Sequence, residues 1–396
     1  MVGVSGGIAA YKACEVISRL QKTGASITVV MTEHAHKFIT PLTLGSLARG
    51  QVLSDLFAEK PGGITHINVA QEADIIVVVP ATANILAKAA HGIADDLLST
   101  ILLATSAPVF FAPAMNVKMY QHPATQDNIK TLKSRDCKFI EPATGVLACG
   151  DIGPGRLAQI DDIIIAIENI LMPVHDYAGK HVMVTAGCTH EQIDPVRYLA
   201  NHSSGKMGYA IAKAARDRGA KVTLISGPTA LDKPDGVEVI AITSAQQMYD
   251  AVLKIFPQTD IVIKAAAVAD YRLQNPASYK IKKENECLTL QLIKNPDILK
   301  ELGARKESHQ LLVGFAAETN QVEDYARKKL LDKNLDAIVA NDVAVPGIGF
   351  GSDDNSVTIF LKDGTKTELP KMSKTKVANK ILDKISPIFQ NTYKQE

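Results

Sequence analysis

Apolar positions in the first part of the chain alternate between strand-like and helix-like spacing. The first apolar run ends at Val4, and a glycine-rich turn follows it. The next apolar residues recur at helical spacing, which predicts a helix that ends near Gly24. Residues 26–31 predict the next strand, and residues 74–80 are apolar on both faces, as a central parallel strand requires. The apolar face of the predicted helix consists of Ala10, Ala13, Ile17 and Leu20.

The same order of elements starts again near residue 180. Residues 181–185 predict a strand, and a glycine-rich loop leads to a helix expected over residues 207–218. Proline and glycine interrupt the periodicity over residues 171–179. The sequence therefore predicts two Rossmann-like, three-layer α/β domains with mainly parallel sheets, over residues 1–172 and 180–396, joined by a linker at 173–179.

Composition narrows the classes of protein that fit this pattern. Of 396 residues, 46% are hydrophobic and 21% are charged, and the net charge is +1. That charge argues against a sequence-independent nucleic-acid binder or a membrane-surface protein. No run approaches the roughly 20 apolar residues of a membrane span, and the N-terminus has no signal-peptide pattern. The five cysteines have no Cys-x-x-Cys spacing, so we expect neither a disulfide framework nor a zinc site, and we expect a reducing cytoplasm.

A first candidate site begins at the turn Ser5-Gly6-Gly7. Backbone N–H groups between a strand and a helix suit a phosphate, although this turn lacks the G-x-G-x-x-G spacing of dinucleotide sites. A plain tight turn is the alternative. Thr32 follows the second strand, so its hydroxyl is expected at the carboxyl edge of the sheet, where such folds bind ligands.

Four more segments accompany this turn: residues 66–69 with His66 before a strand, residues 80–84, Pro113-Ala114-Met115-Asn116, and Ala148-Cys149-Gly150-Asp151. Each segment alone is weak, since an isolated histidine is usually structural and Met115 could serve packing only. Together they resemble the FMN-containing cysteine decarboxylases, over nearly all of the first 170 residues. The resemblance implies a flavodoxin-like domain. It also implies that the thiol of a cysteinyl substrate is oxidised to a thioaldehyde, so that the electrons left by CO₂ can delocalise as an enethiolate.

The resemblance also implies roles for individual residues. His66 would be the catalytic base, Asn116 would hold the substrate carboxylate, and Cys149 would protonate the enethiolate from a loop that closes over the substrate. A thiol is mostly protonated at neutral pH and can act as an acid. The expected FMN contacts are Ser5, Gly6, Gly7, Thr32, Pro80, Thr82, Asn84 and Met115.

The densest polar motif of the chain spans residues 194–208 and precedes the second predicted helix. Its hydroxyls, glycines and Lys206 suit a phosphate loop, but the Walker A spacing is missing. A helix N-cap formed by Ser203 or Ser204, with a solvated lysine, is the alternative. Further motifs lie at residues 265–271, 280–283, 294–298, 314–319 and 340–342. With them, residues 180–390 resemble the bacterial phosphopantothenate–cysteine ligases.

That second resemblance implies that CTP activates a carboxylate as an acyl-cytidylate, which cysteine then attacks. Lys280 would act in the first step, Asn201 would stabilise the acyl-cytidylate, and Mg²⁺ would offset phosphate charge. Lys282 and Lys283 are expected to be solvated. The metal ligands are not identified by the sequence. The expected nucleotide contacts are Lys264, Ala265, Ala266, Asp270, Lys280, Pro296, Asp297, Ile298, Leu299, Phe315, Lys329 and Lys333.

The resemblance further implies small-molecule substrates only, 4′-phosphopantothenate, L-cysteine and CTP, and a dodecamer of trimeric decarboxylase and dimeric ligase sites. Two features depart from the families: the first strand is short, and Cys188 stands where glycine or proline is more familiar. Two other classes of protein are alternatives to this interpretation. A non-catalytic regulatory subunit is disfavoured by His66, Asn116 and Cys149 together, and an NAD-linked oxidoreductase is disfavoured by the missing dinucleotide motif.

Overall fold

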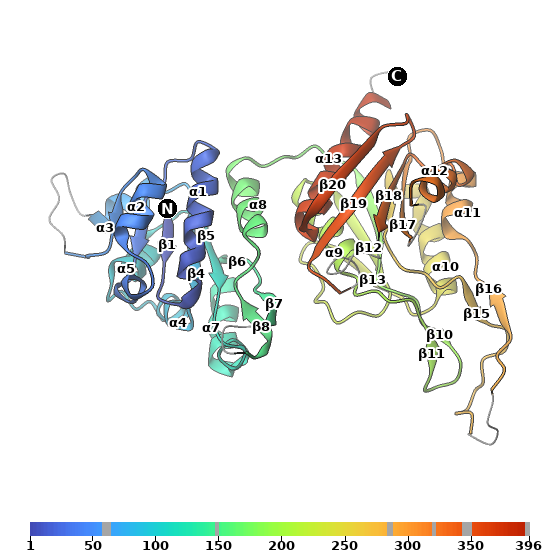
Figure 1. Cartoon of the computed structure of the whole chain (residues 1–396), viewed down its shortest axis with the longest axis horizontal. Coiled ribbons are helices and arrows are strands. Elements are labelled where there is room, and N and C mark those ends of the chain that lie inside the picture. The colour runs from blue at the N-terminus through green and yellow to red at the C-terminus, as the bar shows by residue number, and fades with distance from the viewer. Residues whose placement is uncertain (58–64, 147–149, 283–287, 319–321, 343–350, 393–396) are drawn as a thin grey trace. The chain divides into compact units, whose positions relative to one another are not determined.

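The computed structural model describes residues 1–57, 65–146, 150–282, 288–318, 322–342 and 351–392. The chain forms two compact units, Met1–Pro173 and Val174–Glu396 (Figure 1). Cys149 therefore lies outside the described residues. Within the described residues, no helix is long and apolar enough to cross a membrane.

The first unit is built on a six-stranded parallel sheet of order β3-β2-β1-β4-β5-β6. A separate antiparallel hairpin, β7–β8, follows it. Apolar residues alternate between the two faces, with Val77 and Val79 in one core and Ile76 and Val78 in the other. The strands are β1 (Val2–Val4), β2 (Val29–Met31), β3 (Val52–Leu53), β4 (Ile76–Ala81), β5 (Val109–Pro113), β6 (Lys138–Phe139), β7 (Ala143–Val146) and β8 (Ile152–Arg156).

Helices cover both faces of this sheet (Figure 1). The helix predicted after the first strand is split into a 3₁₀ turn and α1, and its four predicted apolar residues are buried as expected. The helices are η1 (Ile8–Lys12), α1 (Ala13–Lys22), η2 (Glu33–Lys37), α2 (Pro41–Ala48), α3 (Thr65–Glu72), α4 (Ala83–His91), α5 (Leu97–Ala104), α6 (Val117–Gln121), α7 (Pro123–Lys133) and α8 (Ile160–Leu171).

The second unit has an eight-stranded sheet of order β13-β12-β9-β14-β17-β18-β19-β20. The first six of these strands are parallel, and β19 and β20 extend the sheet as an antiparallel edge. Two small antiparallel pairs, β10–β11 and β15–β16, project from this unit in Figure 1. The strands are β9 (His181–Ala186), β10 (Glu191–Gln192), β11 (Tyr198–Leu199), β12 (Lys221–Ser226), β13 (Glu238–Ala241), β14 (Ile261–Lys264), β15 (Tyr271–Leu273), β16 (Leu292–Lys294), β17 (Leu311–Glu318), β18 (Ala337–Asp342), β19 (Asp354–Leu361) and β20 (Lys366–Ser373).

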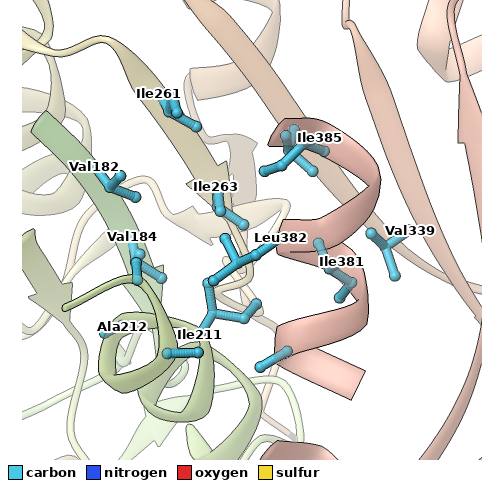
Figure 2. Packing of buried hydrophobic residues seen from close by; sticks show 14 of the residues in the cluster. Val182, Val184, Ile211, Ala212, Ile261, Ile263, Val339, Ile381, Leu382 and Ile385 are labelled. Atoms are coloured by element: carbon cyan, nitrogen blue, oxygen red, sulfur yellow. The ribbon is translucent and has the colours of Figure 1, made fainter. Parts of the chain in front are cut away.

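Two helices seal one face of the second sheet. Ile211 of one helix and Leu382 of the other are fully buried against Val184 and Ile263 of the central strands (Figure 2). The other face is covered by three further helices with their own apolar core. The two helices on the first face are α9 (Lys206–Asp217) and α13 (Lys374–Thr392). The remaining helices are α10 (Ala245–Ile255), η3 (Phe256–Gln258), α11 (Ile298–Arg305) and α12 (Val322–Asp332).

The segment expected to be a linker packs onto the second unit. Tyr177 is fully buried, its hydroxyl donates to the carbonyl of Leu382 at 2.8 Å, and its ring packs edge-on against Phe389. Arg218 pairs with Asp176 beside it. Residues 176–178 are therefore part of the folded second unit.

The prediction of two Rossmann-like α/β units with mainly parallel sheets is confirmed. The strand order 3-2-1-4-5-6 of the first unit is that of dinucleotide-binding folds, whereas flavodoxin has the order 2-1-3-4-5. The strand order therefore differs from that of flavodoxin itself. Flavodoxin inserts its third strand beside the first, whereas β3 here pairs with β2 at the sheet edge.

Two candidate active sites

The strand order of the first sheet reverses between β1 and β4, which is where ligands bind in such folds. Ser5 follows β1 and is 2% exposed. Its hydroxyl donates to the carbonyl of Pro80 at 2.7 Å and accepts the backbone N–H of Thr82 at 3.1 Å. The Ser5 side chain therefore ties two ligand-binding loops together, and its hydroxyl proton is already used.

The turn after Ser5 lies close to the backbone that follows β2. A Cβ atom on Gly6 would lie 2.5 Å from Cβ and 2.7 Å from the carbonyl carbon of His34. At Gly7 the nearest atom to such a Cβ would be Thr82 Cγ2, at 3.6 Å. Only glycine fits at Gly6, so the backbone of this turn stays exposed to a ligand without a covering side chain.

Two polar atoms near this edge are buried without a hydrogen-bond partner in the described part of the chain, Thr32 Oγ1 and His66 Nδ1. Thr32 directly follows β2, and its backbone N–H donates to the carbonyl of Val4 at 3.0 Å. His66 lies in the first turn of α3 and not directly before a strand as predicted. A buried polar group without a partner costs free energy, so both atoms favour a polar ligand.

The predicted carboxylate-binding motif contacts Asp151 and the hairpin β7–β8. Asn116 caps α6 by accepting the N–H of Lys118 at 2.8 Å, and its amide group donates to Asp151 at 2.9 Å. The backbone N–H of Met115 donates to the carbonyl of Gly155 at 2.9 Å. Asp151 and Gly155 thus attach the hairpin β7–β8 to the segment that follows β5.

The other predicted flavin contacts lie on the loop after β4. Pro80 is buried inside β4, so its carbonyl rather than its ring takes part in polar contacts. Thr82 caps α4, accepting the N–H of Ile85 at 3.4 Å, and Asn84 is exposed in the first turn of that helix. The N-terminus of α4 therefore faces the carboxyl edge of the sheet.

In the second unit the strand order reverses between β9 and β14. The loop after β14, which contains Ala265 and Ala266, is held by two threonines that the sequence reading did not single out. Thr185 accepts the N–H of Ala266 at 3.2 Å, and Thr189 accepts the N–H of Ala269 at 3.0 Å. Hydroxyls at the end of a buried strand are the sequence signal that could have identified them.

Positive charge gathers beside this loop. Lys264 ends β14, and burial together with the weaker effect of Lys333 lowers the pKa of Lys264 to about 8. Lys329 acts in the same direction, whereas Asp297 and Asp270 oppose it. Lys333 pairs with Asp297 at 2.9 Å. Lys264 is therefore within electrostatic range of four other predicted nucleotide contacts.

Three predicted nucleotide contacts, Asp297, Ile298 and Leu299, have side chains that are already engaged within the protein. Ile298 and Leu299 are 2% and 6% exposed, and both side chains pack in the core. Asp297 caps their helix by accepting the N–H of Lys300 at 3.1 Å, so only backbone groups of this turn could face a ligand. Pro296 and Phe315 are half-buried at the same edge.

The two predicted ligase catalytic residues are exposed. Asn201 donates to the carbonyl of Val268 at 3.1 Å, which attaches it to the loop after β14. Lys280 precedes Ile281, whose backbone N–H donates to Asp194 at 3.2 Å. Lys206 is not a free phosphate ligand, because it pairs with Asp353 at 2.6 Å.

No three His, Cys, Asp or Glu side chains gather as a metal site among the residues that the structure describes. The acidic groups nearest the lysine cluster are Asp270 and Asp297, and the second is already paired with Lys333. The described residues thus offer one or two carboxylates, which is enough for Mg²⁺ only when substrate phosphates supply further oxygens.

Family models match both units of the chain. Residues 1–172 match the flavoprotein family, and residues 177–388 match the C-terminal domain of DNA/pantothenate metabolism flavoproteins. The coenzyme A biosynthesis bifunctional protein CoaBC of Bacillus subtilis (strain 168) is 53% identical over 393 residues, covering 98% of this chain and 97% of that protein. Its counterpart from Vibrio cholerae serotype O1 is 48% identical, covering 96% of each chain.

A crystal structure of the C-terminal domain of such a bifunctional protein covers 55% of this chain and 99% of its own, with 46% identity and a TM-score of 0.48. The two family matches follow one another along this chain, and the relative from Bacillus subtilis aligns with nearly the whole of it. The chain therefore belongs to the family of bifunctional coenzyme A biosynthesis proteins and is an enzyme with two activities, a phosphopantothenoylcysteine decarboxylase and a phosphopantothenate–cysteine ligase.

Proposed function

We propose that the second unit uses CTP to join 4′-phosphopantothenate to L-cysteine through an acyl-cytidylate, and that the first unit uses FMN to convert the product to 4′-phosphopantetheine. The observation that carries the assignment of the first unit is the pair of buried, unpartnered atoms Thr32 Oγ1 and His66 Nδ1 at the carboxyl edge. A flavin with a phosphate and polar ring atoms would satisfy both.

The residues of the first unit fit FMN. The glycine turn would offer backbone N–H groups to the phosphate, with Thr32 and the N-terminus of α4 beside it. Pro80, Thr82, Asn84 and Met115 would line the ring. When bound, the flavin would accept two electrons from the substrate thiol and later return them.

The protein groups would bind the substrate and move protons. His66 would remove a proton as the thiol is oxidised, and Cys149 would supply one in the final reduction. Asn116 would donate its amide N–H to the substrate carboxylate, which would replace Asp151 as the acceptor. The existing contact of Asn116 with Asp151 supports this role, because the amide already binds a carboxylate there.

In the second unit the lysine cluster would bind the triphosphate. Lys264, Lys329 and Lys333 offer positive charge beside the loop formed by Ala265 and Ala266, and Lys333 would exchange Asp297 for a phosphate. Lys280 would stabilise charge on the α-phosphate as the carboxylate attacks, and Asn201 would hold the acyl-cytidylate. Mg²⁺ would be held mainly by phosphate oxygens, with Asp270 as the nearest unpaired candidate.

We further propose a homo-oligomer, a dodecamer of trimeric decarboxylase and dimeric ligase sites, in the cytoplasm. Large apolar side chains remain uncovered on the first unit, including Leu42 at 79%, Ile8 at 65% and Leu103 at 63% exposed. Subunit contacts would cover them. The described cysteines are all free thiols, which suits a reducing compartment.

Each unit can be tested separately. Phosphopantothenoylcysteine supplied directly should release CO₂ without any nucleotide, and Cys149→Ser should release CO₂ yet form no 4′-phosphopantetheine. In the presence of 4′-phosphopantothenate, the enzyme should release pyrophosphate from CTP, with ATP as the comparison nucleotide. CO₂ release that needs CTP, or ATP supporting ligation as well as CTP, would contradict the respective assignment.

A further inference from the structure

Asp194 has no part in the roles above, yet it contacts the segment that carries Lys280. Its side chain is 0% exposed. Oδ1 accepts the backbone N–H groups of Val196 and Arg197, at 2.8 and 2.9 Å. Oδ2 accepts hydrogen bonds from Nε–H of Arg197, at 3.0 Å, and from Nη2–H of the same guanidinium. This carboxylate is therefore buried and fully hydrogen-bonded.

The Asp194–Arg197 pair holds the peptide group of Ile281 by both of its polar atoms. The Ile281 N–H donates to Asp194 Oδ2 at 3.2 Å, and Arg197 Nη2 donates to the Ile281 carbonyl at 3.1 Å. The N–H of Ala277 also donates to the carbonyl of Ile193, at 3.0 Å. Residues 277–281 are thus fixed at two points to a turn more than 80 residues earlier.

Lys280 immediately precedes this fixed peptide. Its side chain is exposed, and it makes no hydrogen bond or ion pair with any other described residue. A lysine side chain carries about 2 kcal/mol of rotamer entropy, so its position depends on a well-placed backbone. The anchored Ile281 peptide provides that placement.

The hydrogen bond from Arg197, followed by those of nearby backbone N–H groups, holds the pKa of Asp194 well below its usual range despite burial. Asp194 is therefore an anion throughout the pH range in which the enzyme would work. The anion matters because a neutral amide could not accept hydrogen bonds at both positions.

We propose that Asp194 is a positioning residue for ligation, which acts through Arg197 and the Ile281 peptide to aim Lys280 at the reacting groups. This inference rests on the proposed role of Lys280 in activating the carboxylate. The new element is that Asp194 determines the position of Lys280.

The test is Asp194→Asn, measured as pyrophosphate release from CTP and 4′-phosphopantothenate. The new amide NH₂ would face two donors, Arg197 and the Ile281 N–H, so the hydrogen bonds that hold the Ile281 peptide are lost. We expect kcat to fall about tenfold or more, because small misplacements of catalytic groups are costly, while KM for CTP changes less than about twofold. Asp217→Asn, at an exposed aspartate beside Arg216, is the matched control and should leave kcat unchanged.

A double-mutant cycle with Lys280→Ala separates positioning from a general structural effect. If Asp194 acts through Lys280, Asp194→Asn will lower kcat no further in the Lys280→Ala background. An equal fall in both backgrounds would overturn the proposal. So would full activity of Lys280→Ala in an otherwise active enzyme. If the unchanged enzyme released no pyrophosphate at all, the proposed ligase function would fail, which is a distinguishable result.

Arg197→Lys gives a second route should Asp194→Asn fold poorly. Arg197 is 38% exposed, and lysine keeps the charge but cannot reach both Asp194 and the Ile281 carbonyl. The same cycle with Lys280→Ala should again be non-additive, with phosphopantothenoylcysteine decarboxylation as fast as in the unchanged enzyme. Additive effects of Arg197→Lys and Lys280→Ala would refute the proposal.

Discussion

Ser5 and Thr82 are joined by a hydrogen bond of 3.1 Å, from the Thr82 backbone N–H to the Ser5 hydroxyl, across the point where the first sheet reverses its strand order. The bond fixes the glycine turn after β1 relative to the start of α4. Both of these backbone segments are proposed to bind the flavin. The geometry of the flavin site therefore depends on a side chain that is buried behind it.

Ser5→Ala should weaken flavin binding and destabilise the first unit. The change leaves the Thr82 N–H and the Pro80 carbonyl without their partner, and each buried unsatisfied group costs about 1–3 kcal/mol. Flavin titration by fluorescence and urea unfolding measure the two effects. Thr23→Ala, which removes a 2.8 Å hydrogen bond at the far end of α1, should lower stability and leave flavin affinity unchanged. A Ser5→Ala protein with normal flavin affinity would contradict the account.

Gly6→Ala and Gly7→Ala should behave differently although the residues are adjacent. A Cβ at position 6 would collide with Cβ and the backbone of His34, whereas at position 7 it would meet only Thr82 Cγ2 at an ordinary distance. We expect Gly6→Ala to be purified without flavin and with a lower Tm, and Gly7→Ala to keep its stability. The visible absorbance of the purified proteins measures bound flavin, and thermal melts measure stability. Equal loss of flavin and of Tm in both variants would argue against the steric explanation.

CTP binding near pH 8 should be accompanied by proton uptake at Lys264. Burial lowers its pKa to about 8, and the triphosphate favours the ammonium form and raises the pKa again. Calorimetry in buffers of different ionisation enthalpy measures the uptake. Lys264→Met should abolish it, and Lys300→Met, at an exposed lysine on α11, should not. The measurement covers roughly pH 7.5–8.5, the range around the lowered pKa of Lys264. CTP binding without proton uptake in this range would show that Lys264 does not contact the phosphates.

The lowered pKa of Lys264 also makes the stability of the nucleotide-free protein depend on pH. The folded-state pKa lies below the ordinary value of 10.5, so between about pH 8 and 10.5 the unfolded chain binds more protons at this lysine. The contribution of Lys264 to stability therefore rises with pH over that interval. Lys264→Met should flatten this part of the pH dependence of unfolding.

Arg218→Met should destabilise the second unit by about 3 kcal/mol, because breaking a buried ion pair leaves its partner unpaired. Arg218 has a side chain only 8% exposed and pairs with Asp176 and Asp383. Arg216→Met is the control: its partner Asp217 lies at the surface, and the expected cost is about 0.5 kcal/mol. Urea unfolding followed by circular dichroism measures both, and similar midpoints for the two variants would contradict a structural role for residues 176–178.

Much of the fold could be predicted from the sequence, because strands buried on both faces are nearly continuous apolar runs. Residues 74–80 and 181–185 were expected as strands, and β4 and β9 span Ile76–Ala81 and His181–Ala186. The antiparallel edge β19–β20 was not expected, since such strands have exposed faces and weaker patterns. The strand order of the first sheet could not be predicted, because local periodicity does not encode which strands pair.

The sites were harder to predict in detail. The motifs predicted which loops form the sites, and the loops after β1, β4, β9 and β14 lie where the two sheets reverse order. The sequence could not show that the Ser5 hydroxyl is used internally or that Ile298 is buried, because both depend on contacts with distant segments. Asp194 and Ile281 are 87 residues apart, and only the folded chain reveals their hydrogen bond.

The most direct test incubates the purified protein with 4′-phosphopantothenate, L-cysteine, CTP and Mg²⁺, identifies the products by mass and records the visible spectrum. The account predicts a yellow protein that forms CO₂, pyrophosphate and 4′-phosphopantetheine in equal amounts. Accumulation of phosphopantothenoylcysteine without CO₂ would contradict the catalytic account of the first unit. Bound flavin with neither product formed would contradict the assignment of both residue sets and favour a regulatory role.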